Sequence, residues 1–250
     1  MAMLLYNGNN KGGIMKKFLN ILLVFFAVGG LFTVLFFGIY GAVESTKTAI
    51  DENNTAAELP LPEKTGGLRG QLGIDKNINE SNIDEYLGRD DSVYRDMRML
   101  VDTASYEAIG GDSYLSGYVD GFEVVPYPKL IQTTGLPPEV GEAYSGNTLF
   151  SRQDDKIIAN YKESMDFMEY CFPKDKNIFL MCGGGGYAGM TKELLTELGW
   201  DKDKIWVVGG YWYYEGEHNV QIKHNDNGII SYDFWKVPYH DIDFEYLNEK

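Results

Sequence analysis

The chain has 250 residues, of which 24% are charged and 44% are hydrophobic, and its formal net charge at pH 7 is -15. Such an acidic balance argues against a nucleic-acid partner and against peripheral binding to anionic lipid, because both carry negative charge. The length and the apolar content suffice for one packed domain with appendages. We therefore expect a folded, acidic domain that binds no nucleic acid.

An uncharged run from Phe18 to Val43 lies near the start of the chain, and about 20 apolar residues suffice to cross a bilayer. Lysines stand in residues 1–17 and acids follow the run, so the positive-inside rule places residues 1–17 in the cytoplasm and everything after Val43 outside. The alternative is a secretory signal that begins at Met15 and is cleaved near Val43, but the run is longer than the usual signal core. We expect residues 18–43 to be a single-pass signal anchor in the cell membrane. In either case the domain lies on the extracytoplasmic side.

Composition divides the rest of the chain into three parts. Residues 44–82 are polar and broken by prolines and glycines, which is typical of a linker. Residues 83–216 are expected to form the folded domain. Residues 217–250 contain two alternating segments around Asn227-Gly228, a dipeptide that favours a tight turn, so we predict an accessory C-terminal hairpin there.

Within the expected domain, apolar runs and segments of helical periodicity alternate along the chain. Strands that alternate with helices predict an α/β fold with a central parallel sheet covered on both faces. Ligands of such sheets bind beyond the carboxyl ends of the strands. The predicted strands are residues 96–102, 122–127, 177–181 and 205–208, and the predicted helices are residues 157–170 and 188–198.

Cys182 follows the third predicted strand and is itself followed by four glycines and a predicted helix. A thiol in that position lies below free backbone N–H groups and at the positive end of a helix dipole, and both favour a thiolate and a bound anion. The alternative is a buried structural cysteine, but four consecutive glycines, each with an ordering cost, favour a functional loop. We predict that Cys182 is a nucleophile whose pKa lies below that of a free thiol. The expected anion-binding loop consists of Gly183, Gly184, Gly185, Gly186 and Tyr187.

The glycine loop matches two nucleotide-binding patterns only in part. Gly184, Gly186 and Gly189 satisfy G-x-G-x-x-G, yet the next predicted strand ends in glycines, where an acid for the ribose is expected. The P-loop pattern fails because Tyr187 and Ala188 stand where it requires glycine and lysine. The three histidines lack metal-ligand spacing. We therefore expect neither a cofactor nor a metal.

Four segments between Ser92 and Gly216 resemble the rhodanese-like sulfurtransferase family, and they occur in the family's order. The resemblance implies a three-layer fold around a central parallel sheet. It also implies that Cys182 takes sulfane sulfur from a donor, becomes a persulfide and passes the sulfur to an acceptor. The segments are Leu100–Asp102 as the opening strand, Gly117–Phe122 with Val124–Tyr127 after it, Cys182 with its loop, and Ile205–Gly216 with its double glycine and Trp212.

The partners that this resemblance implies are a small sulfur donor or a protein persulfide or thiol. The N–H groups of the glycine loop would hold the transferred sulfur and the anionic part of the donor. A second hypothesis is that the protein has the same fold but does not turn over a standard sulfur donor. In that case the protein is a binding or redox-sensing module.

The chain departs from the family at positions where basic groups are common. Valine and arginine usually follow the opening aspartate, but Thr103 and Ala104 follow Asp102. Tyr118 replaces the usual histidine, and Tyr187 stands at the end of the loop, where a basic residue is common. We therefore expect weak activity on thiosulfate. Supporting roles are assigned to Asp102, Tyr118, Arg152 and Trp212, with Arg152 as the candidate replacement for the missing charge.

The second cysteine, Cys171, directly follows the helix predicted at residues 157–170. In an oxidising compartment a disulfide with Cys182 is one interpretation. The other interpretation, which we favour, is a core position at the end of the helix.

Overall fold

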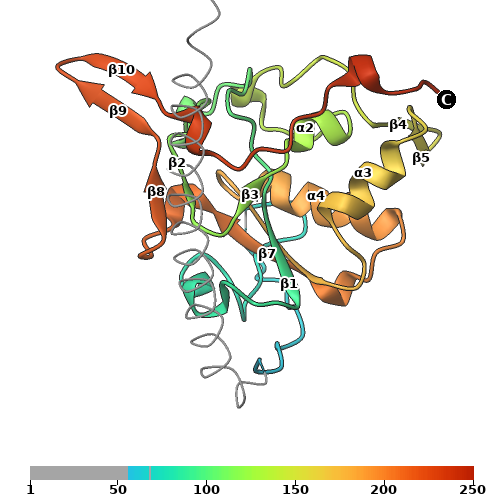
Figure 1. The fold of residues 1–250 in the computed structure, drawn as a ribbon, viewed down its shortest axis with the longest axis horizontal. Coiled ribbons are helices and arrows are strands. Elements are labelled where there is room, and N and C mark those ends of the chain that lie inside the picture. Colours follow the sequence, from blue (N-terminus) through green and yellow to red (C-terminus); the bar gives the residue numbers. More distant parts are fainter. Residues whose placement is uncertain (1–55, 68) are drawn as a thin grey trace, which may run out of the picture. The chain divides into compact units, whose positions relative to one another are not determined.

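The computed structural model describes residues 56–67 and 69–250 (Figure 1). The membrane anchor predicted at residues 18–43 lies outside these residues, and within them no helix is long and apolar enough to span a bilayer. Leu59–Lys250 form one compact unit, and the fold and the site described below belong to it.

A parallel four-stranded sheet lies at the centre of this unit, with the strand order β3-β1-β6-β7. This sheet confirms the α/β class and the parallel arrangement that the alternation of strands and helices predicts. Strands β6 and β7 are buried along almost their whole length, as parallel strands covered on both faces are expected to be. The strands of the sheet are β1 (Ser92–Asp96), β3 (Glu123–Val124), β6 (Asn177–Cys182) and β7 (Ile205–Gly210).

Successive residues of β6 contribute to two different core clusters, because side chains alternate across a strand. Cys182 belongs to the larger cluster, which includes residues of three helices on one face of the sheet (Figure 1). Met181 belongs to a second cluster together with residues of a 3-10 helix at Ile83–Tyr86. Both faces of the sheet are therefore covered. The helices are α2 (Tyr127–Leu130), α3 (Ser164–Cys171) and α4 (Gly186–Glu197).

Residues 74–82 belong to the folded core, so the prediction of a linker as far as residue 82 is wrong. Ile78 is fully buried in the second cluster, and the N–H of Asp75 donates to the carbonyl oxygen of Val207 at 2.8 Å. The polar composition of this segment reflects local turns. The carboxylate of Asp75, for example, accepts hydrogen bonds from the N–H groups two and three residues further along the chain.

Three predicted elements differ in the structure. The prediction of a strand at residues 96–102 is wrong, because β1 already ends at Asp96. The strand predicted at residues 122–127 is shorter in the structure and consists of the two residues of β3. The helix predicted at residues 157–170 is divided, because its first part forms the second strand of a hairpin that turns at Asp154 and Asp155. Both turn residues have positive φ, 47° and 62°, so local turn geometry overrides the helical spacing. The hairpin strands are β4 (Phe150–Gln153) and β5 (Lys156–Ala159).

The C-terminal hairpin predicted around Asn227-Gly228 is confirmed, and it extends away from the central sheet (Figure 1). Both turn residues have positive φ, 54° and 90°, as a tight hairpin turn requires. The rest of the tail is not accessory, since Ile242 lies in the larger core cluster and β8 pairs with β2. These strands are β2 (Gly117–Val119), β8 (Asn219–Gln221), β9 (Lys223–Asp226) and β10 (Ile229–Tyr232).

Candidate functional site

A cavity of about 410 Å³ lies where the parallel strands end and their following loops meet. Its walls bring together Cys182, Asp102, Trp212 and part of the predicted anion-binding loop, namely Gly183, Gly184, Gly186 and Tyr187. Other lining residues come from three segments without a sequence signal, residues 69–71, 106–115 and 135–140. The location agrees with the general rule that ligands of parallel sheets bind beyond the carboxyl ends of the strands.

Cys182 is the last residue of β6 and lines the cavity, although only 3% of its surface is exposed. The N–H of Gly185 donates to Sγ of Cys182 at 3.1 Å. Gly185 has a φ of 100°, a left-handed conformation that glycine adopts without strain, and α4 begins at the next residue. The thiol therefore lies at a helix N-terminus and accepts a backbone hydrogen bond, as the sequence predicts.

Burial raises the pKa of the Cys182 thiol, so the predicted low pKa is wrong. Loss of solvent around the thiolate is the largest cause, and the negative charge of Asp96 adds to it. The N–H groups of Ala188 and Gly185 and the guanidinium of Arg98 act in the opposite direction without outweighing burial. The sequence indicated the helix terminus but not the depth of the thiol. At neutral pH the free protein therefore holds a protonated thiol here.

The indole ring of Trp212 lies directly against the glycine loop. A Cβ added at Gly183 would come within 2.4 Å of the ring, and a Cβ added at Gly184 would come within 3.2 Å. Gly210 is constrained in a similar way, because its Cβ would lie 2.0 Å from the carbonyl oxygen of Gly183. Part of the glycine content therefore serves close packing around Cys182.

Gly183→Ala is expected to lower the free energy of unfolding by about 1–3 kcal/mol, the usual cost of overpacking, because its methyl group would overlap the Trp212 ring. Gly186→Ala is the matched control, since a Cβ at this first residue of α4 meets no atom within 4 Å. We expect the control to be neutral or slightly stabilising, because alanine favours a helix. Urea denaturation measures both changes. Equal losses in the two variants would show that the contact with Trp212 imposes no constraint.

Asp102 is held by two tyrosines in the wall of the cavity. The hydroxyl groups of Tyr106 and Tyr187 donate to Oδ2 of Asp102 at 2.9 and 2.8 Å, and the N–H of Ala104 donates to Oδ1 at 3.0 Å. Burial raises the pKa of both tyrosines, so both remain protonated donors. The Tyr187 hydroxyl is thus bound to a carboxylate and does not replace the basic residue that is common at the end of the loop. No pattern in the sequence pointed to Tyr106.

The aspartate that ends the opening strand of the sheet is Asp96, not Asp102. Asp96 is fully buried, and Nε of Arg98 donates to its Oδ1 at 2.9 Å. Nη2 of Arg98 also donates to the carbonyl oxygen of Gly117 at 2.8 Å, and Arg98 lines the cavity. An arginine two residues after an aspartate is therefore present at the end of the opening strand, but it follows Asp96 and not Asp102. The sequence pattern that could have identified Arg98 is the triplet Asp96-Met97-Arg98. It was overlooked because the strand was predicted at residues 96–102, whereas β1 ends at Asp96.

Two of the predicted supporting residues lie outside the cavity lining. Tyr118 belongs to a separate core cluster, and its hydroxyl donates to the carbonyl oxygen of Lys236 at 3.1 Å. Arg152 donates from both terminal nitrogens to the carboxylate of Glu197 at 2.8 Å, and both side chains are partly exposed. Neither residue contributes to the site, so the prediction that Arg152 replaces the missing charge is wrong.

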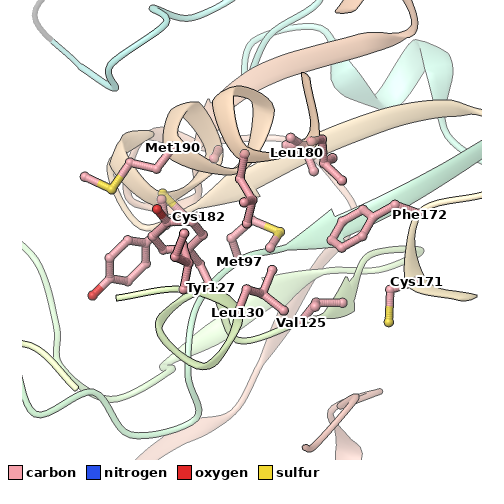
Figure 2. Close-up of a cluster of buried hydrophobic side chains, with 14 of the residues drawn as sticks. Met97, Val125, Tyr127, Leu130, Cys171, Phe172, Leu180, Cys182 and Met190 are labelled. Carbon is pink, nitrogen blue, oxygen red and sulfur yellow. The ribbon is translucent and has the colours of Figure 1, made fainter. Parts of the chain in front are cut away.

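Cys171 is the last residue of α3 and is fully buried. Both cysteines are free, so the core position is confirmed and the disulfide is not formed. Figure 2 shows Cys171 and Cys182 in different parts of the larger core cluster, with Met97 and Leu130 between them in this view.

Alkaline pH is expected to destabilise the fold through Cys171, because burial raises its pKa to about 12. A free thiol titrates at about 8.5, so above that pH the unfolded chain loses a proton that the folded chain retains. Stability is then fully present below about pH 8.5 and falls by up to about 1.4 kcal/mol per pH unit above it. The stability advantage of the native chain over Cys171→Ala should shrink by about 1.6 kcal/mol between pH 8.5 and 10. Denaturant titrations at both pH values measure it, and a constant difference would contradict the raised pKa.

Within residues 56–67 and 69–250, no group of three or more His, Cys, Asp or Glu side chains is arranged to hold a metal ion. Comparisons of the chain with protein-family models, with curated proteins and with solved structures find no match. The functional inference therefore depends on the residues and the geometry of the cavity.

Proposed function

We propose that the protein is a sulfurtransferase with a three-layer, rhodanese-like fold, in which Cys182 carries sulfur as a persulfide. The main support is the position of Cys182 at the carboxyl end of β6, where it faces the cavity and receives the N–H of Gly185 at 3.1 Å. A helix N-terminus and converging N–H groups stabilise an anionic sulfur. The triplet Asp96-Met97-Arg98 after the opening strand adds a second point of resemblance to the family.

In the first step the thiolate of Cys182 attacks the sulfane sulfur of the donor. The bond between that sulfur and the rest of the donor breaks, an S–S bond to Cys182 forms, and the rest of the donor leaves with the electron pair. In the second step a nucleophilic acceptor takes the outer sulfur and releases the thiolate. Because burial raises the pKa of Cys182, the first step is expected to accelerate as the pH rises from 7 to 9.

A second candidate is a binding or redox-sensing module that uses the same thiol without turning over a sulfur donor. The burial of Cys182 favours it, because a thiol that is 3% exposed and has a raised pKa reacts slowly in the free protein. The cavity beside the thiol favours the sulfurtransferase over a redox sensor, because a sensing cysteine has no need of a ligand site of this size. We therefore place sulfur transfer first.

Sulfur uptake is tested by incubating the full-length chain with thiosulfate or with cysteine persulfide and analysing its peptides by mass spectrometry. A gain of one sulfur atom on Cys182, reversed when cyanide is added as acceptor, would support the sulfurtransferase. Oxidation of Cys182 by hydrogen peroxide, without a gain of sulfur from either donor, would favour the redox-sensing module.

We also propose that residues 18–43 anchor the protein in the cell membrane, with residues 56–250 on the extracytoplasmic side. The uncharged run and the lysines before it support this orientation. Protease added to intact cells is expected to digest the domain and to spare a small membrane-bound fragment. Full protection in intact cells, together with digestion after permeabilisation, would place the domain in the cytoplasm.

A further inference from the structure

The walls of the cavity beside Cys182 are largely apolar. Its volume of about 410 Å³ falls in the range of sites that bind organic ligands, about 300–1,000 Å³. A small inorganic ion such as thiosulfate would leave most of this space unfilled. The apolar side chains of the wall include Ile109, Leu115, Leu136, Pro137, Val140 and Met190.

The two arginines of the wall are already paired with carboxylates. Arg98 binds the buried Asp96, and Arg69 forms an ion pair with Glu80 through Nη2, although its buried Nη1 has no hydrogen-bond partner among the residues that the structure describes. Asp102 adds a carboxylate to the wall, which accepts hydrogen bonds from two tyrosines. A dianionic donor would therefore lose its hydration without gaining an uncompensated positive partner, which is unfavourable in a buried site. The charge distribution and the volume together favour a donor with an organic, uncharged body.

On the basis of the sulfur transfer proposed for Cys182, we propose that the donor is a small organic persulfide, R–S–SH, whose group R is apolar. The Cys182 thiolate attacks the outer sulfur, and the S–S bond of the donor breaks. R–S⁻ leaves with the electron pair and takes a proton from water, while Cys182 keeps the outer sulfur as Cys–S–SH. The group R binds the apolar wall to which Ile109 and Leu136 belong, and this binding selects the donor.

The test compares two alkyl persulfides, benzyl persulfide and cysteine persulfide, as donors to the full-length chain, with persulfide formation on Cys182 followed by mass spectrometry. We expect benzyl persulfide to react at least ten times faster at equal low concentration, a preference of the size that a few methylene groups produce in an apolar pocket. Ile109→Glu places a charge on the wall and should lower the ratio of the two rates about tenfold. Ile230→Glu is the matched control, because Ile230 is similarly exposed, 51% against 42% for Ile109, but lies on β10 outside the cavity lining. It should leave the ratio unchanged.

Equal rates with the two donors, or a ratio that Ile109→Glu and Ile230→Glu change equally, would overturn this inference while leaving sulfur transfer intact. Failure of every donor, in a chain that circular dichroism shows to be folded, would overturn the sulfur transfer itself. A calorimetric measurement of benzyl mercaptan binding to the Cys182→Ser chain tests the apolar ligand class separately from sulfur transfer. Binding requires the cavity but no transfer of sulfur. Binding that Ile109→Glu weakens and Ile230→Glu does not would support the apolar ligand class, and undetectable binding to the folded chain would contradict it.

Discussion

Replacement of Cys182 by serine is expected to abolish sulfur uptake and to reduce transfer to cyanide to the rate measured without protein. A serine hydroxyl does not form the S–S bond through which sulfane sulfur is carried. The variant should remain folded, because the N–H of Gly185, which donates to Sγ in the native chain, retains an oxygen acceptor. The cost of burying a hydroxyl in place of a thiol should stay within about 1–3 kcal/mol. Mass spectrometry of the Cys182 peptide measures uptake, and urea denaturation measures stability.

Cys171→Ala is the matched control for this prediction. Both cysteines are free and buried in the same core cluster, but Cys171 lies at the end of α3 and does not line the cavity. We expect sulfur uptake in this variant to stay within about twofold of the native rate, since no transition-state contact is removed. Persulfide formation that persists in Cys182→Ser and disappears in Cys171→Ala would reverse the assignment of the nucleophile.

The strand, loop and helix around Cys182 could be predicted from the sequence because their determinants are local. The apolar run of β6, the four glycines and the helical spacing of α4 all lie within about 20 consecutive residues. The carboxyl end of a parallel strand then fixes the edge of the sheet on which the thiol lies. The edge of the sheet on which Cys182 lies could therefore be predicted without knowing the positions of segments distant in sequence.

The chemical environment of the thiol could not be predicted in this way. The sign of the Cys182 pKa shift depends on burial, and the cavity walls come partly from residues 69–71 and 106–115, which are far from the loop in sequence. The position of Arg98 depends on where β1 ends, and pairing fixes that end, since Asp96 is opposite Met181 of β6. The apolar residues after Asp96 fit a strand equally well, so periodicity alone could not place the boundary.

Arg98→Ala is expected to lower the free energy of unfolding by about 3–5 kcal/mol, because it leaves a buried carboxylate without its partner. Asp96 has no exposed surface, and the Arg98 side chain is 9% exposed. The substitution also leaves the carbonyl oxygen of Gly117 without its donor. Arg152→Ala is the matched control, since Arg152 also binds a carboxylate with two nitrogens but is 42% exposed. An exposed pair contributes about 0–1 kcal/mol, so the control should differ little from the native chain.

The double substitution of Asp96 and Arg98 by alanine distinguishes a buried ion pair from general loss of packing. If the cost of Arg98→Ala comes from an uncompensated charge, removal of Asp96 as well should restore part of the stability, so the double variant loses less than the sum of the single variants. Additive losses would show that the two side chains act independently. Equal losses in Arg98→Ala and Arg152→Ala would contradict the role of burial. Arg98→Ala should also affect sulfur uptake, because the guanidinium of Arg98 lowers the pKa of Cys182. Without it, uptake is expected to accelerate at a higher pH than in the native chain.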